Sequence, residues 1–247
     1  MANYTFYAEI PEVGGKTRPK TAIYFPPAYG EGKVLNLLIY LHGTGAKPID
    51  VYLNDARFPL REKVKGSGKN VVFVAPTLTD TQKTSDSGKF EEDPDWYIEK
   101  VRSAIKDQEG DVAEVNGIIL ACHSGGGRTT LQIVKNLVKY KPKLKEVWGF
   151  DCLYMPPGHD PSPWDWRNEK TKKATRPPET EVESQWAQNM PLAFVYYWGT
   201  VMRSQNLEKL VKDNPSIPIT VTRSGADSHD HVPRTHLMDR LNNTKWL

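Results

Sequence analysis

Cysteine is scarce in this chain of 247 residues, which contains only Cys122 and Cys152. Two cysteines are too few for a disulfide framework, and they lack the spacing of a metal site, so no metal is expected. We expect both to be buried thiols. A single bridge between them is the alternative, because each ends a strand and we expect the two strands to be neighbours.

Long hydrophobic runs and a one-sided charge are also lacking. The longest apolar runs, 34–41 and 117–122, are shorter than the ~20 residues that cross a bilayer, so no membrane span is expected. The formal net charge is only +3, from 33 basic and 30 acidic residues, which argues against a nucleic-acid partner. The first residues lack a basic stretch followed by an apolar core, which favours a cytoplasmic protein. A secreted protein whose signal had been removed is the alternative.

Short β-rich runs alternate with amphipathic stretches, the order that produces a mostly parallel sheet with helices on its faces. The expected strands cover residues 21–25, 34–41, 70–75, 117–122, 146–150, 192–198 and 217–222. A segment before the first of these strands is expected to pair with it as a hairpin. Apolar spacing predicts helices over 96–108 and 129–140, and a last helix that carries Leu237 and Leu241 on one face.

The stretch 155–190 is rich in Pro, Lys and Trp and is too long for a plain connector. Such a stretch is typical of a lid or a binding loop. The sequence therefore predicts one α/β domain over residues 1–247, with 155–190 as a lid-like or binding insertion.

The strongest local motif is Ala-Cys-His-Ser-Gly-Gly-Gly at 121–127, between an expected strand and an expected helix. A sharp turn from strand to helix needs small residues two before and two after the serine, and Cys122 and Gly126 occupy these places. The start of a helix also favours developing negative charge. The motif predicts Ser124 as a nucleophile. A phosphate-binding loop is the alternative, although the chain has no Gly-x-x-x-x-Gly-Lys-Ser/Thr run.

A second motif, His-Gly-Thr-Gly at 42–45, ends an expected buried strand. A loop there can turn a backbone N–H toward the nucleophile, and glycine permits this geometry without a side-chain clash. The N–H groups of Thr44 and Gly125 are therefore the predicted donors of an oxyanion hole.

The order of these features, with His42-Gly43 first, then Ser124 and then a late histidine, resembles the α/β-hydrolase superfamily of esterases, lipases and depolymerases. The resemblance covers nearly the whole chain. It implies the α/β-hydrolase fold, a mostly parallel central sheet flanked by helices, with a long insertion after the strand ending at Asp151. It also implies a Ser-His-Asp triad and two-step acyl transfer without a cofactor, with the acid and the histidine after the serine.

The base is expected in the loop after the last strand, which returns to the nucleophile. This loop contains Ser228-His229-Asp230-His231. His229 is the predicted base, because Ser-His followed by a Pro-initiated helix is the arrangement associated with the superfamily. His231 is the alternative base.

The acid departs from the commonest pattern of the superfamily, because the strand at 192–198 is followed by no carboxylate up to residue 202. Some lipase-like relatives place the acid after the strand that follows the nucleophile's helix, and Asp151 stands there. A carboxylate at the end of a buried strand is costly unless it has a partner such as a histidine. Asp151 is therefore the predicted acid, and the alternatives are Asp227, Asp160 and Asp230.

Three aromatic residues, Trp164, Trp186 and Tyr154, are predicted to bind substrate as a flat apolar wall, with burial against the sheet edge as the alternative. The predicted function is hydrolysis of a carboxylic ester, with a small molecule or a polymer such as acetylated or feruloylated polysaccharide as substrate. An amidase or peptidase with the same triad is one alternative. A binding protein that has kept the fold without catalysis is the other.

Overall fold

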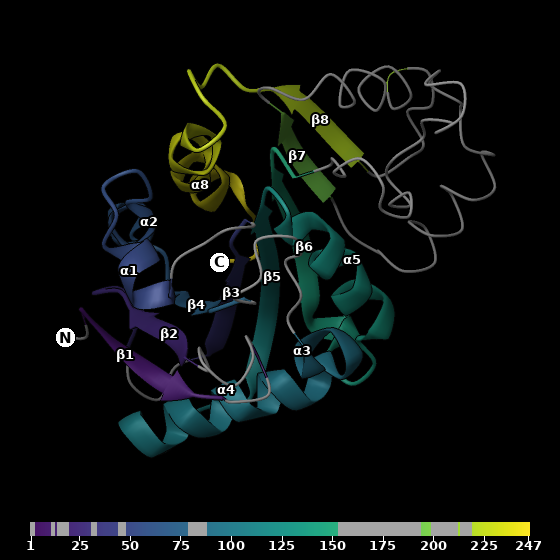
Figure 1. Ribbon diagram of the computed structural model, residues 1–247. Coiled ribbons are helices and arrows are strands. Elements are labelled where there is room, and N and C mark those ends of the chain that lie inside the picture. Colours follow the sequence, from purple (N-terminus) through teal and green to yellow (C-terminus); the bar gives the residue numbers. More distant parts are fainter. Residues whose placement is uncertain are drawn as a thin grey trace.

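The computed structural model describes residues 3–10, 13, 20–30, 34–43, 48–78, 88–152, 194–198, 212 and 219–247. The strands in this part form one eight-stranded sheet in the order β1-β2-β4-β3-β5-β6-β7-β8 (Figure 1). Their bounds are β1 Tyr4–Glu9, β2 Lys20–Phe25, β3 Leu35–Leu41, β4 Val72–Pro76, β5 Val115–His123, β6 Leu144–Phe150, β7 Phe194–Trp198 and β8 Ile219–Arg223. β1 pairs antiparallel with β2, and β2 pairs antiparallel with β4. All other neighbours are parallel, so the mostly parallel sheet and the initial hairpin are as predicted.

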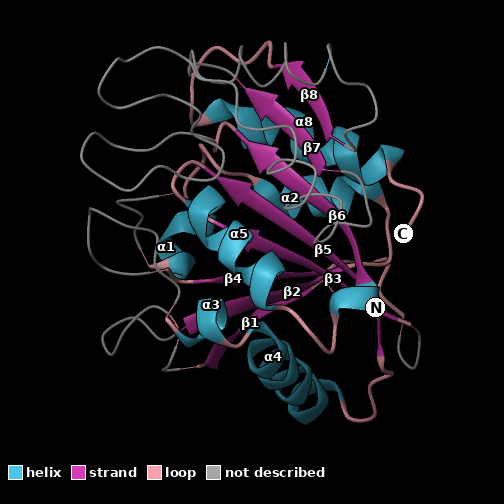
Figure 2. Cartoon of the chain, turned by 90° about the vertical axis from the view of Figure 1, so that its right-hand side faces the viewer, coloured by secondary structure: helices cyan, strands magenta, loops and turns pink. Residues whose placement is uncertain are grey.

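The helices of the described residues cover both faces of this sheet (Figure 2). They are α1 Ile49–Leu53, α2 Leu60–Ser67, α3 Lys89–Glu92, α4 Pro94–Glu109, α5 Gly126–Asn136 and α8 His231–Asn243, with a 3-10 turn at Lys141–Lys143. Buried side chains of α3, α4 and α5 share one hydrophobic core. Those of α1, α2 and α8 share a second core on the opposite face. The molecule is therefore a three-layer α/β/α sandwich.

Strand β3 shows how the sequence produces these two cores. All seven of its side chains are buried. Leu37 and Ile39 belong to the core under α4 and α5, whereas Leu38 and Tyr40 belong to the core under α1, α2 and α8. Alternate residues of a strand point to opposite faces, so a nearly continuous apolar run is what a central strand covered on both sides requires.

Helix α5 is shorter than the sequence predicted. It ends at Asn136 rather than near residue 140, and Leu137 adopts extended dihedral angles. Val138, an apolar residue within the predicted helix 129–140, is 76% exposed. The prediction of helix over 137–140 is therefore wrong.

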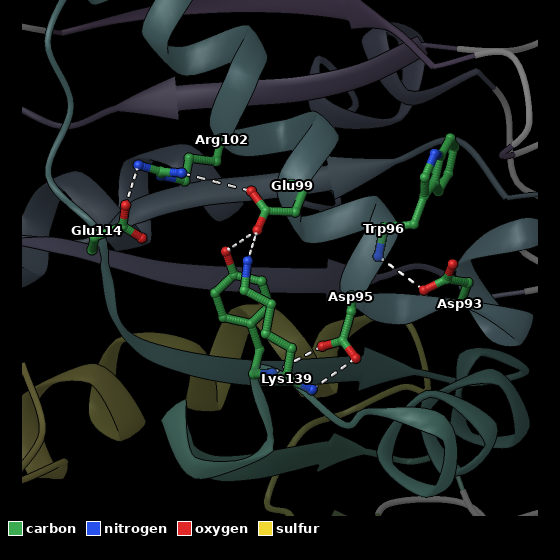
Figure 3. A network of polar contacts seen from close by, with 8 residues as sticks. Asp93, Asp95, Trp96, Glu99, Arg102, Glu114 and Lys139 are labelled. Carbon is green, nitrogen blue, oxygen red and sulfur yellow. Dashed lines mark hydrogen bonds and ion pairs between the residues drawn. The ribbon is translucent and has the colours of Figure 1, made fainter.

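A carboxylate from another helix explains this early end. Asp95 in the first turn of α4 accepts hydrogen bonds from the backbone N–H groups of Val138, Lys139 and Tyr140, each at 2.9 Å. Figure 3 shows the bond from Lys139 to Asp95. In a continued helix these N–H groups would bond to carbonyls four residues back. Asp95 supplies the alternative acceptor, and the chain leaves the helix.

No described helix combines the length and the apolar composition that a bilayer crossing requires. The predicted insertion 155–190 lies outside the described residues.

Candidate active site

Ser124 lies in a sharp turn between β5 and α5. Its φ angle is +52°, in the left-handed region that side-chain-bearing residues rarely adopt. Two backbone hydrogen bonds hold this conformation: the N–H of Ser124 donates to the carbonyl of Phe150 at 3.3 Å, and its own carbonyl accepts from Gly127 N–H at 3.2 Å. Ser124 is 5% exposed, so its environment is almost entirely protein. The strained turn predicted at this serine is present.

Three glycines make the turn compatible with its neighbours. A Cβ on Gly43 would lie 2.6 Å from Ser124 Cβ and 3.1 Å from its Oγ. A Cβ on Gly126 would lie 2.7 Å from the carbonyl oxygen of Leu41, and one on Gly127 only 2.3 Å from that of Cys152. Side chains at these positions would collide with the serine or with rigid backbone. The turn at Ser124 therefore packs directly onto the end of β3 and the residues just after β6.

His42 orders the start of the predicted oxyanion loop. Its Nε2 accepts the backbone N–H of Leu78 at 2.9 Å, so the proton resides on Nδ1, which donates to the carbonyl of Gly43 at 2.9 Å. This bond holds Gly43 beside Ser124. Of the two predicted oxyanion donors, Gly125 caps the start of α5, directly after the serine, and Thr44 lies outside the described residues.

Asp151 and His229, the predicted acid and base, are hydrogen-bonded to each other. His229 Nδ1 lies 2.8 Å from Asp151 Oδ2. Asp151 is completely buried and has a φ angle of +47°. Its N–H donates to the carbonyl of Tyr197 at 2.7 Å, which ties the acid to the adjacent strand β7. A buried carboxylate needs such a partner, and a histidine whose Nδ1–H donates to a carboxylate has Nε2 as its basic nitrogen.

The alternative base, His231, lies in a different environment. It is the first residue of α8, and its Nδ1 contacts Asp227 in an exposed pair. The hydrogen bond from His231 lowers the pKa of the Asp227 carboxyl. Asp230, another alternative acid, forms an ion pair with Arg57 at 3.1 Å. The structure thus brings His229 to Asp151, pairs the alternative base His231 with the alternative acid Asp227 in an exposed contact, and pairs Asp230 with Arg57.

The two cysteines adjoin these residues in the sequence, since Cys122 precedes His123 and Cys152 follows Asp151. Cys122 and Cys152 are free and buried, with their Sγ atoms 3.5 Å apart. Burial raises the pKa of the Cys152 thiol. Both cysteines are therefore the buried thiols that the sequence predicted.

The sequence did not predict the contribution of one further residue to the site. This residue is His123, directly before the serine. Its Nε2 lies 3.1 Å from the backbone oxygen of His229, and the two imidazole rings are 4.5 Å apart. Burial lowers the pKa of His123 to about 3, so the ring is neutral at pH 7. The contact between the two tilted rings places the predicted base beside the turn at Ser124.

Three side chains near the predicted base could also offer ligand atoms to a metal ion. Potential ligand atoms of His123, His229 and Asp230 lie within 4.8 Å of one another in the described part of the chain. Hydrogen bonding and the Arg57 ion pair already account for this grouping. The residues predicted to bind substrate, Tyr154, Trp164 and Trp186, and the alternative acid Asp160 lie outside the described residues.

Comparison with solved structures identifies the fold. The chain has the α/β-hydrolase fold, as the sequence predicted. It is similar to a mutant of the feruloyl esterase module from Clostridium thermocellum complexed with sinapinate, with 15% identity, a TM-score of 0.62, and coverage of 98% of this chain and 87% of the other. It is also similar to an S-formylglutathione hydrolase from Agrobacterium tumefaciens, at 16% identity and a TM-score of 0.57, over 96% and 92% of the two chains.

A third similar structure is a ferulic acid esterase from the anaerobic fungus Anaeromyces mucronatus, with 17% identity, a TM-score of 0.56, and coverage of 98% and 90%. No family model matches the sequence. No curated protein matches it either.

Proposed function

We propose that this protein is a serine hydrolase that cleaves carboxylic esters through an acyl-enzyme, with Ser124, His229 and Asp151 as its catalytic triad. The observation that carries the proposal is the 2.8 Å hydrogen bond between His229 and the fully buried Asp151, next to a serine in a strained turn. The shared fold with feruloyl esterases and an S-formylglutathione hydrolase supports ester rather than amide cleavage.

In the first half of the reaction, Asp151 accepts a hydrogen bond from the Nδ1–H of His229 and stays ionised, which makes Nε2 the basic nitrogen of the ring. His229 Nε2 removes the proton of Ser124 Oγ as this oxygen attacks the ester carbonyl. The N–H groups of Thr44 and Gly125 stabilise the resulting oxyanion. The tetrahedral intermediate then expels the alcohol, which takes its proton from His229, and the acyl group stays on Ser124.

In the second half, water attacks the acyl carbonyl while His229 Nε2 takes its proton. The second tetrahedral intermediate collapses and the C–O bond to Ser124 breaks. The serine oxygen regains the proton from His229, and a carboxylic acid leaves. The buried carboxylate stabilises the imidazolium that forms in each half, which is the electrostatic reason for its place beside Nδ1.

Labelling with a fluorophosphonate probe tests the nucleophile and the base together. We expect one adduct, on Ser124, located by mass spectrometry. Labelling should disappear in Ser124→Ala and fall strongly in His229→Ala, whereas His231→Ala is the matched control and should label like the wild type. Loss of labelling in His231→Ala with retention in His229→Ala would contradict the choice of base.

Paired substrates test the bond that is cleaved. We expect p-nitrophenyl esters to be hydrolysed much faster than the matching p-nitroanilides, because an amine is the poorer leaving group. Faster anilide cleavage would indicate an amidase. A chain that neither labels nor hydrolyses any ester would be a binding protein with this fold.

A further inference from the structure

His123 makes a hydrogen bond that connects the nucleophile turn to the loop of the base. Its Nε2 lies 3.1 Å from the backbone oxygen of His229. A carbonyl oxygen only accepts, so Nε2 must carry the proton and donate it. The same carbonyl accepts the N–H of Val232 at 3.3 Å, in the turn that begins α8. Two donors therefore hold the carbonyl of His229, one from its own loop and one from the residue before Ser124.

The ring of His123 is packed on two sides. On one side it lies against the ring of His229, with centroids 4.5 Å apart and an interplanar angle of 34°. The ring of Phe58 lies 6.0 Å away, and this phenylalanine stacks on Tyr52 at 4.2 Å. His123 is 3% exposed. Such packing leaves the side chain little freedom to change rotamer, so its donor is held in place.

The neutral state of His123 suits this position. Burial, aided by the nearby His229, lowers its pKa to about 3, and the ring therefore carries no charge at neutral pH. During catalysis His229 would become an imidazolium, and a second positive ring at 4.5 Å would oppose that step. His123 thus contributes a donor and a packing surface without competing for the proton.

We propose that His123 is a positioning residue: its hydrogen bond to the backbone carbonyl of His229 keeps the imidazole of His229 aligned between Ser124 and Asp151. The kinetic part of this inference rests on the proposed function. The structural part concerns the His229–Asp151 contact and can be measured without turnover.

Two substitutions separate the hydrogen bond from the ring. His123→Gln retains an N–H donor at about the same reach and loses the ring. His123→Phe retains a ring and loses the donor. We normalise kcat to the number of Ser124 side chains that the probe labels. This kcat should fall about tenfold in the Phe variant, with KM unchanged, and should stay within threefold of wild type in the Gln variant. Unfolded protein is not labelled at Ser124, so counting only labelled serines removes its contribution. A merely structural role of His123 would lower the number of labelled serines but not kcat per labelled serine.

Proton NMR provides the reading that does not need turnover. The Nδ1 proton of His229, bonded to a buried carboxylate, should appear far downfield, and its absence in His229→Ala assigns it. We expect this signal in the wild type and in His123→Gln, and its broadening by water exchange in His123→Phe.

The outcomes are distinguishable. Unchanged kcat and an unchanged signal in His123→Phe, or equal losses in both variants, would overturn the proposal that the donor positions His229. If the wild type neither labels nor hydrolyses esters, the proposed function fails. The NMR comparison would then still decide whether His123 holds His229 against Asp151.

Discussion

Asp151 and His229 are 78 residues apart in the chain, yet their side chains meet at 2.8 Å. The sheet explains the meeting. Phe150 on β6 pairs with His123 on β5, so Asp151 and Ser124 follow the ends of adjacent strands. α8 packs back onto the face of the sheet that includes Trp148 of β6, and the loop before it delivers His229 to the same edge. Parallel strands thus collect residues that are distant in sequence at one end of the sheet.

Replacing Asp151 by Asn tests the acid. Asn tolerates the left-handed backbone found at Asp151, so the fold should be retained. The amide removes the negative charge that stabilises an imidazolium at His229 and can favour the wrong tautomer of its ring. We expect kcat on a p-nitrophenyl ester to fall by about 10³- to 10⁴-fold.

The matched control for that substitution is Asp227→Asn, which alters the exposed partner of His231. It should stay within twofold of wild type, with circular dichroism confirming that both variants are folded. A variant Asp151→Asn that kept more than a tenth of the activity would show that another group serves as the acid.

Gly127→Ala tests the backbone contact between the turn at Ser124 and Cys152, which follows β6. The new Cβ would lie 2.3 Å from the carbonyl oxygen of Cys152, so helix α5 or the segment after β6 must move. We expect a loss of about 3 kcal/mol in the free energy of unfolding, measured in urea, and slower labelling of Ser124.

Gly66→Ala is the matched control, because Gly66 is also helical but its nearest neighbour would be the flexible Sδ of Met238 at 3.3 Å. That variant should lie within about 1 kcal/mol of wild type. Equal stability of the two variants would contradict a rigid contact at Gly127.

Asp95→Ala tests why helix α5 ends early. The substitution removes the acceptor of three backbone N–H groups, and that of Tyr140 is partly buried. We expect a cost of about 1–3 kcal/mol in the free energy of unfolding. Asp107→Ala, at an exposed position of the same helix, removes the same charge and should cost no more than about 0.5 kcal/mol. Similar losses in both variants would contradict a specific role of the Asp95 carboxylate as the acceptor of these N–H groups.

His123 should make the protein sensitive to acid. Its pKa is about 3 in the folded protein, compared with 6.5 for an ordinary histidine. Below pH 6.5 the unfolded chain therefore binds a proton that the folded chain does not. The stability contributed by neutral His123 is complete above pH 6.5 and is lost as the pH falls toward 3, by about 1.4 kcal/mol per pH unit.

Urea unfolding of the wild type and His123→Gln at pH 7.5 and pH 5 measures this contribution. Glutamine does not titrate, so the difference in unfolding free energy between the two proteins should shift by about 2 kcal/mol in favour of the variant at pH 5. A difference that does not change with pH would contradict a neutral, buried His123.

The strands were predictable because their signal is local. A run covered on both faces is continuously apolar, and β3 at Leu35–Leu41 differs from the predicted 34–41 by one residue. The end of α5 was not predictable, because it depends on Asp95. This residue lies 43 positions before Val138, the first residue whose N–H donates to it. Helices α1 and α3 have only five and four residues, too few for a helical period to emerge.

The site was predictable in part, because only some of its residues have a local signal in the sequence. The turn at Ser124 follows from a local motif, and the predicted acid and base lie in contact, although their catalytic roles stay predictions until they are labelled and substituted. The contact of His123 with His229 joins residues 106 apart and has no local signal. A histidine directly before the nucleophile was visible in the sequence, but its partner was not.

The N–H of Asp151 donates to the carbonyl of Tyr197, which joins the two ends of the long stretch that separates them. Asp151 is therefore anchored by strand backbone on both sides of that stretch. Changing the number of residues between two points that are already held together changes the free energy little. A chimera in which 156–190 is exchanged for a short Gly-Ser linker should therefore keep the downfield proton of His229, and under the proposed function this stretch can be varied to change which esters are accepted while Ser124, His229 and Asp151 stay in place.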